Sequence, residues 1–84
     1  MTARMERAIC SRINPEFSVP MKKQVLFYYP RFAEDESYDE QKIRSELGRV
    51  RAAISDAIYA GEPTEELLVR REALYLLAED KGLM

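Results

Sequence analysis

Apolar residues in the middle of the chain recur with the spacing of a helix seam. Ile43, Leu47, Val50, Ile54 and Ala57 are separated by steps of four, three, four and three residues. This is the spacing by which one helix packs along another. Upstream, Ser37 followed by Glu40 forms a capping-box pattern. The pattern therefore predicts a helix from about residue 38 to residue 60.

A second helix is expected directly after the first. Gly61 stands where a left-handed residue commonly ends a helix, and Pro63 suits the first turn of a new one. The next segment is rich in leucine and ends at Lys81-Gly82. These signals predict a helix over residues 63–80, and an antiparallel helical hairpin over residues 37–82.

The second helix of this hairpin is apolar on nearly all sides. Three groups of residues point in three directions at about 100° per residue: Leu67, Leu74, Leu77 and Ala78; Leu68 and Tyr75; and Val69, Ala73 and Leu76. One antiparallel helix covers only one stripe of such a surface. The other faces need the N-terminal part of the chain or another protomer.

The first third of the chain follows a different pattern. Residues 2–13 have helical spacing, which Asn14-Pro15 interrupts. Pro20 and Pro30 then bracket an aromatic and β-branched run over residues 25–29. Such runs favour extended structure. We therefore expect a short N-terminal helix and an extended aromatic connector ahead of the hairpin.

Length and composition fit a single small domain of the all-α class, covering residues 1–84. The 84 residues are 46% hydrophobic and 33% charged, as in ordinary globular proteins. The longest apolar run has five residues, so we expect no membrane span, and no secretory signal is evident at the N-terminus. With one cysteine, a reducing compartment such as the cytoplasm is the expected location.

Charge is unevenly distributed along the chain. Residues 1–33 carry six basic and two acidic side chains, whereas residues 34–84 carry seven basic and thirteen acidic ones. Such a basic arm could pack on a neighbour's acidic body, bind nucleic acid, or remain solvated. Lys22 and Lys23 are its candidate anion-binding residues.

The chain lacks the residues that most catalytic mechanisms require. The chain has no histidine, and Cys10 is its only cysteine, which excludes Ser-His triads and Cys/His zinc sites. The three glycines are far apart, so no phosphate-binding loop is present. The adjacent carboxylates lie at predicted helix starts, where they stabilise the helix dipole. We expect no enzymatic activity, no cofactor and no metal.

One face of the first hairpin helix is a candidate binding surface. Its residues lie within about 80° of one another, and they are Arg44, Gly48, Arg51, Ser55 and Tyr59. A glycine in mid-helix costs about 1 kcal/mol relative to alanine, which suggests close approach by another group. The face could be solvated, contact a protein, or bind a nucleotide or nucleic acid.

Association is the other functional expectation. A monomer built only of the hairpin would expose an apolar patch that monomers seldom tolerate. We expect the chain to bind itself, or a larger protein, through one set of side chains: Phe27, Tyr28, Tyr29, Leu68, Tyr75 and Leu76.

A pattern over residues 27–78 resembles a known family. The segments Phe27-Tyr28-Tyr29-Pro30, Pro63-Thr64-Glu65-Glu66 and Arg71-Glu72-Ala73-Leu74-Tyr75, with Tyr38, look like the helical hairpin of phage anti-CBASS proteins. Those proteins sequester cyclic oligonucleotides as multimers. The chain lacks their Trp-Ala-Asn run, so the resemblance implies an oligomeric helical hairpin but carries over no binding residue.

The sequence thus favours a small, non-enzymatic interaction or assembly protein of the phage or mobile-element kind. It would act in the cytoplasm by forming oligomers or by docking on a larger protein. The alternative is a protein that binds an anionic ligand, either a cyclic nucleotide or nucleic acid, through the arginine and tyrosine face and the basic arm.

Overall fold

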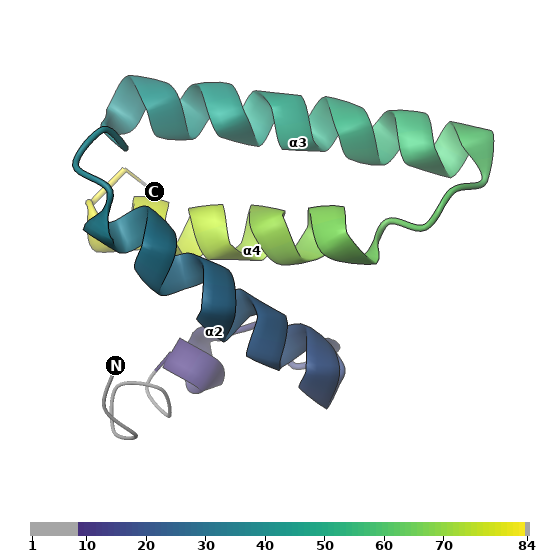
Figure 1. Ribbon diagram of the computed structural model, residues 1–84, viewed down its shortest axis with the longest axis horizontal. Helices are drawn as coiled ribbons and strands as arrows, with labels where there is room; N and C mark the ends of the chain where they lie inside the picture. Colours follow the sequence, from purple (N-terminus) through teal and green to yellow (C-terminus); the bar gives the residue numbers. More distant parts are fainter. Residues whose placement is uncertain (1–8, 84) are drawn as a thin grey trace.

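The protein is all-α. The computed structural model describes residues 9–83, in which α2 (Val19–Glu34), α3 (Glu40–Ala60) and α4 (Glu65–Asp80) are the long helices. Residues 9–12 form a further helical turn, and no strand occurs between residues 9 and 83. The remainder of the helix expected over residues 2–13 lies outside the described residues. In Figure 1, α3 and α4 run antiparallel and α2 crosses the opposite side of α4.

The hairpin of α3 and α4 confirms the prediction, with small shifts at its ends. α3 begins at Glu40 because Asp39, not Ser37, is its N-cap, and the carboxylate of Asp39 accepts the backbone N–H of Lys42 at 2.8 Å. The hydroxyl of Ser37 donates instead to Asp35, at 2.6 Å. The expected Ser37 capping box was therefore wrong. α4 begins at Glu65, so Pro63 stays in the turn.

Both helices of the hairpin end in the same glycine motif. Gly61 and Gly82 have left-handed backbones, with φ of 73° and 72°. After α3 the N–H of Glu62 donates to Ala57, and after α4 the N–H of Leu83 donates to Ala78. This is the Schellman arrangement, which supplies partners for the last carbonyls of a helix.

The expected extended connector was wrong, because residues 25–29 lie inside α2. Ser18 caps this helix, and Pro20 occupies its first turn, where no backbone donor is needed. Pro30 lies inside the helix, which still continues to Glu34. A lone strand would leave its backbone groups unpaired, whereas a helix pairs its own. The run therefore folds as a helix that buries Val25 against α4.

α4 is the central helix and is covered on two sides by its own chain. Val69, Ala73 and Leu76 are buried in a cluster with Val25 of α2 and with Ile9 and Ile13. On the other side, Leu77 and Ala78 pack with Ile43, and Leu74 packs with Val50 and Ile54. The apolar faces of α4 that were expected to need further cover are thus largely covered by α2 of the same chain.

One residue of the basic arm, Arg12, packs on acidic residues of the same chain. Arg12 forms ion pairs with Glu79 and Asp80, each at 2.9 Å. These contacts, led by the hydrogen bond with Glu79, hold the pKa of Arg12 above its usual value. The hydroxyl of Tyr29 also donates to Asp80. Arg12 thus contacts the acidic end of α4 in its own chain, and not one of the three partners expected for the arm from the sequence.

Among the helices described between residues 9 and 83, none is both long enough and apolar enough to span a membrane.

Candidate functional site

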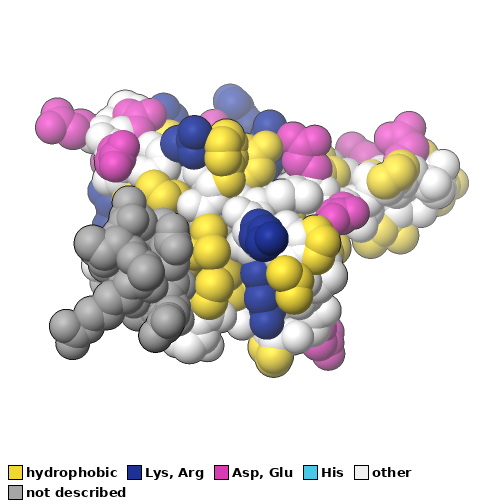
Figure 2. Space-filling model, turned by 60° about the horizontal axis from the view of Figure 1, so that its bottom comes forward, with side chains coloured by type: hydrophobic (Ala, Val, Ile, Leu, Met, Phe, Trp, Pro, Cys, Tyr) yellow, Lys and Arg dark blue, Asp and Glu magenta, His cyan; other side chains and the backbone are white. Residues whose placement is uncertain are grey.

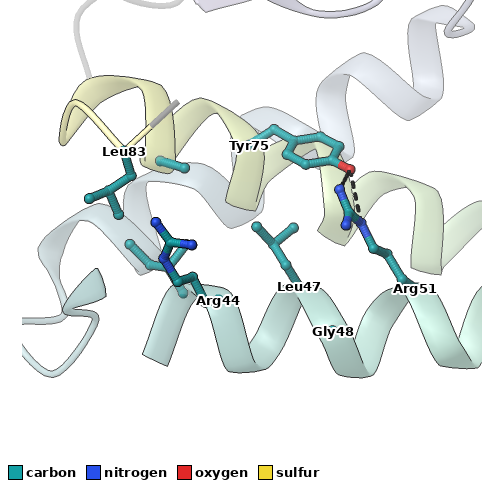
Figure 3. Close-up of a pocket in the computed structure, with 8 residues that line it drawn as sticks. Arg44, Leu47, Gly48, Arg51, Tyr75 and Leu83 are labelled. Atoms are coloured by element: carbon teal, nitrogen blue, oxygen red, sulfur yellow. Dashed lines mark hydrogen bonds between the residues drawn. The ribbon is translucent and has the colours of Figure 1, made fainter. Parts of the chain in front are cut away.

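A groove runs between α3 and α4 on the side away from α2. Its volume is about 310 Å³. Its lining is mostly apolar between two arginines, and the residues are Ile43, Arg44, Leu47, Gly48, Arg51, Tyr75, Ala78 and Leu83. Figure 3 shows Arg44 and Arg51 rising from α3 on either side of Leu47, with Tyr75 reaching over from α4. The groove thus offers an apolar floor with positive charge at both ends.

One rim of the groove is held by a contact between Arg51 and Tyr75. The guanidinium donates to the Tyr75 hydroxyl from Nη2 at 2.7 Å and from Nε at 3.2 Å (Figure 3). Arg71 lies on the ring of Tyr75 as well, 5.9 Å from its centroid. The Tyr75 hydroxyl is a neutral acceptor, so Arg51 keeps its full positive charge for an incoming anion.

The other rim carries Arg44, which pairs with Glu40 one turn earlier on α3. The distance is 2.9 Å, and both side chains are more than half exposed. Exposed pairs of this kind contribute only about 0.3–0.5 kcal/mol. A carboxylate or phosphate that entered the groove could therefore replace Glu40 as the partner of Arg44 at little cost.

Gly48 lies between the two arginines, and nothing within the chain requires it to be glycine. A Cβ atom built there meets no atom within 4 Å, and its φ is negative, as in the rest of α3. Packing and backbone geometry therefore do not explain the residue. An exposed mid-helix glycine leaves room for an outside group to approach the backbone of α3 closely.

Replacing Gly48 by alanine should stabilise the protein. We expect the free energy of unfolding to rise by about 1 kcal/mol, because alanine restricts the unfolded chain and favours the helix. Thermal melting followed by circular dichroism should show an increase of about 4–8 °C. Gly61→Ala is the matched control: its Cβ also has open space, but its φ of 73° is strained for alanine, so it should destabilise. A loss of stability for Gly48→Ala would contradict this description of the site.

The structure divides the arginine and tyrosine face predicted from the sequence. Arg44, Gly48 and Arg51 line the groove, whereas Ser55 and Tyr59 lie beyond it toward the end of α3. Tyr59 is 96% exposed. Lys22 and Lys23 belong to α2, which packs on the opposite side of α4 (Figure 1). These lysines and the arginines of α3 therefore do not form one anion site.

The six residues expected at a partner interface are also separated. Leu76 is 2% exposed and packs against α2, so its assignment to an interface was wrong. Tyr28 and Tyr29 are half-buried and bond to Glu66 and Asp80 of α4. Phe27 is half exposed on α2, with the guanidinium of Arg31 3.4 Å from its ring centroid.

The two remaining residues of that set lie on α4. Leu68 is half-buried beside Val50 and Ile54, and Tyr75 is half-buried at the groove. Tyr75 thus joins Arg44 and Arg51, which the sequence had assigned to a separate site.

Sequence reasoning missed two contributors to this surface. Leu83 reaches the groove because the Schellman motif at Gly82 folds the chain back over Ala78. A hydrophobic residue directly after a terminal helix glycine is the signal that could have revealed it. Ile58, 67% exposed next to Tyr59, was overlooked because it lies beside the buried seam.

Other chemistry is not assembled in the described residues. Within residues 9–83, no group of three or more cysteine, aspartate or glutamate side chains is placed to hold a metal ion. Cys10 is half-buried. The groove between α3 and α4 is thus the site around which the recognition residues gather. Comparisons of the chain with protein-family models, curated proteins and solved structures give no match.

Proposed function

We propose that the protein is a non-enzymatic interaction protein that binds a protein surface in the groove between α3 and α4. The observation that carries this proposal is Gly48, an open mid-helix glycine in an apolar groove with an arginine on either side. The preferred occupant has apolar side chains for the floor and carboxylates for the arginines.

The chemistry of the lining supports a protein occupant. Leu47, Ala78 and Leu83 offer apolar contact area, and burial of such area is the main driving force of association. Tyrosine and arginine are the residue types that most often anchor protein interfaces. Gly48 lets a bulky side chain of the partner lie against the backbone of α3.

Binding of an anionic ligand at the same groove is the second candidate function. It is favoured by the ring of Tyr75, which lies near Arg51 and Arg71 at centroid distances of 5.7 and 5.9 Å. A base could stack at such a position while a guanidinium meets the phosphate. This candidate agrees with the ligand class of the phage sponge proteins that the hairpin resembles.

A photo-crosslinking experiment distinguishes the two candidates. The crosslinker benzoylphenylalanine is placed at Ser55, which is exposed on α3 one turn after Arg51. We expect irradiation of cells that make this variant to yield protein adducts, identified by mass spectrometry. The control carries the crosslinker at Arg49, exposed on the other side of α3, and should yield none of these adducts.

The same experiment can contradict the proposal. Equal adducts from positions 55 and 49, or none from either, would mean that the groove side of α3 is not a protein-binding surface. A nucleotide that copurifies with the wild-type protein and is lost from Arg51→Ala would establish the second candidate instead.

A further inference from the structure

The far end of the hairpin projects from the body of the protein. α3 extends past the beginning of α4, and the turn at residues 61–64 closes this end (Figure 1). Ile58 is 67% exposed and Tyr59 is 96% exposed there. In Figure 2 the projecting arm at the right carries apolar and acidic side chains side by side. We call residues 58–62 the tip.

The tip and the groove have complementary chemistry. The tip combines two exposed apolar side chains with the carboxylate of Glu62, which is also exposed. The groove combines an apolar floor with Arg44 and Arg51. A large exposed aromatic side chain gains about 25 cal/mol for each Å² of apolar area that it buries. The tip thus has the apolar and acidic character that the proposed occupant of the groove requires.

Tip and groove also lie on one side of α3. At about 100° per residue, Gly48 and Tyr59 differ in direction by only about 20°, and about 16 Å of helix separates them. Two copies of α3 that pack antiparallel would therefore bring the tip of each copy to the groove of the other. Both contacts form at once around a two-fold axis, which is the commonest symmetry of protein dimers.

We propose that the groove is occupied by the tip of a second copy of this chain, so that the protein is a symmetric dimer with antiparallel α3 helices. This inference rests on the proposed function and names its partner. Tyr59 of each copy faces Gly48 of the other, where the missing side chain makes room for the ring. Arg44 exchanges its exposed pair with Glu40 for Glu62 of the second copy.

The middle of α3 suits the two-fold axis. In this register the axis passes beside Ala52 and Ser55, which are small and exposed. Small residues at a crossing let two helix backbones approach closely.

Sedimentation of purified variants over a wide concentration range tests the dimer. We expect the wild-type chain to form a dimer, and Tyr59→Ser and Arg44→Glu each to raise its dissociation constant about tenfold or more. Lys23→Glu is the matched control, because Lys23 is exposed on α2 at the opposite side of α4, and it should leave the constant unchanged. All these positions are exposed, so circular dichroism should show unchanged helix content and melting at low concentration.

Two rescue measurements test the pairing itself. A mixture of Arg44→Glu and Glu62→Arg should form a heterodimer more tightly than either variant pairs with itself, because opposite charges then meet at both contacts, whereas like charges meet in each homodimer. The double variant Arg44→Glu with Glu62→Arg should recover most of the lost affinity by restoring the charge pair in reverse.

Three results would overturn the inference. They are a monomeric wild-type chain at every concentration, growth beyond the dimer as concentration rises, and failure of both rescues. None of them affects the proposed function, since crosslinks from position 55 to a different protein would still identify the groove as a protein-binding site. Absence of crosslinks from position 55 to any protein, by contrast, would remove both.

Discussion

Replacing Leu76 by alanine should lower the free energy of unfolding by about 2–5 kcal/mol. Leu76 is 2% exposed and lies in the cluster where α4 meets α2. Truncation removes apolar contacts and leaves a cavity that closely packed helices cannot fill. In a chain of this size each kcal/mol lowers the melting temperature by about 4–8 °C. Thermal or denaturant unfolding followed by circular dichroism measures the loss.

Leu68→Ala is the matched control on the same helix. Leu68 is only half-buried, so its truncation should cost clearly less than that of Leu76. If Leu76→Ala dissociated an oligomer while the melting of the monomer stayed unchanged, Leu76 would belong to an interface. That outcome would contradict the packing of α2 on α4.

The second large effect is expected at the seam between α3 and α4. Ile54→Ala should destabilise by about 2–5 kcal/mol, because Ile54 is 7% exposed and packs with Val50 and Leu74. Leu47 is half-buried at the groove, so Leu47→Ala should cost less, although both belong to the same apolar repeat. Urea titration of the two variants gives the comparison.

The order of these two effects is the decisive observation. Equal losses would mean that Leu47 is as deeply packed as Ile54 and that the groove is closed in solution. Wild-type stability of Ile54→Ala would contradict the hairpin itself.

The hairpin could be predicted because its signals are local. Gly61 adopts without strain the left-handed backbone that terminates α3. The steps of three and four residues keep Ile43, Val50, Ile54 and Ala57 on one side. The residue at which α3 begins was harder to predict. Ser37 and Asp39 can both serve as N-caps, and only the geometry of the folded chain selects Asp39. The error of two residues arises from that local competition.

The helix α2 could not be predicted in the same way. Five consecutive apolar residues at 25–29 have no periodicity that separates a strand from a helix. Pro20 and Pro30 resemble boundaries, yet the first lies at a helix start and the second near its end, where few backbone bonds are lost. The apolar surface of α4 decides between strand and helix, because Val25 is buried against it when residues 25–29 are helical.

Only part of the candidate site could be predicted, because some of its residues come from one helix and others from distant parts of the chain. The direction of Arg44, Gly48 and Arg51 follows from helix geometry, so their shared side of α3 could be inferred from their numbers. Tyr75 and Leu83 come from residues far along the chain, and their arrival at the same groove depends on how α4 rotates against α3. That rotation is a property of the packed core.

The sequence by itself determined the helical class, the hairpin, its glycine ends and the charged side of α3, because each depends on residues within a few turns of one another. Tertiary structure alone decided that α2 is a helix, that it covers α4 within one chain, and that Leu76 is core. It also decided that Tyr75 joins the arginines of α3. These features depend on the burial of apolar area against a segment far away in the chain. The spacing of residues along the chain does not indicate which distant segment that is.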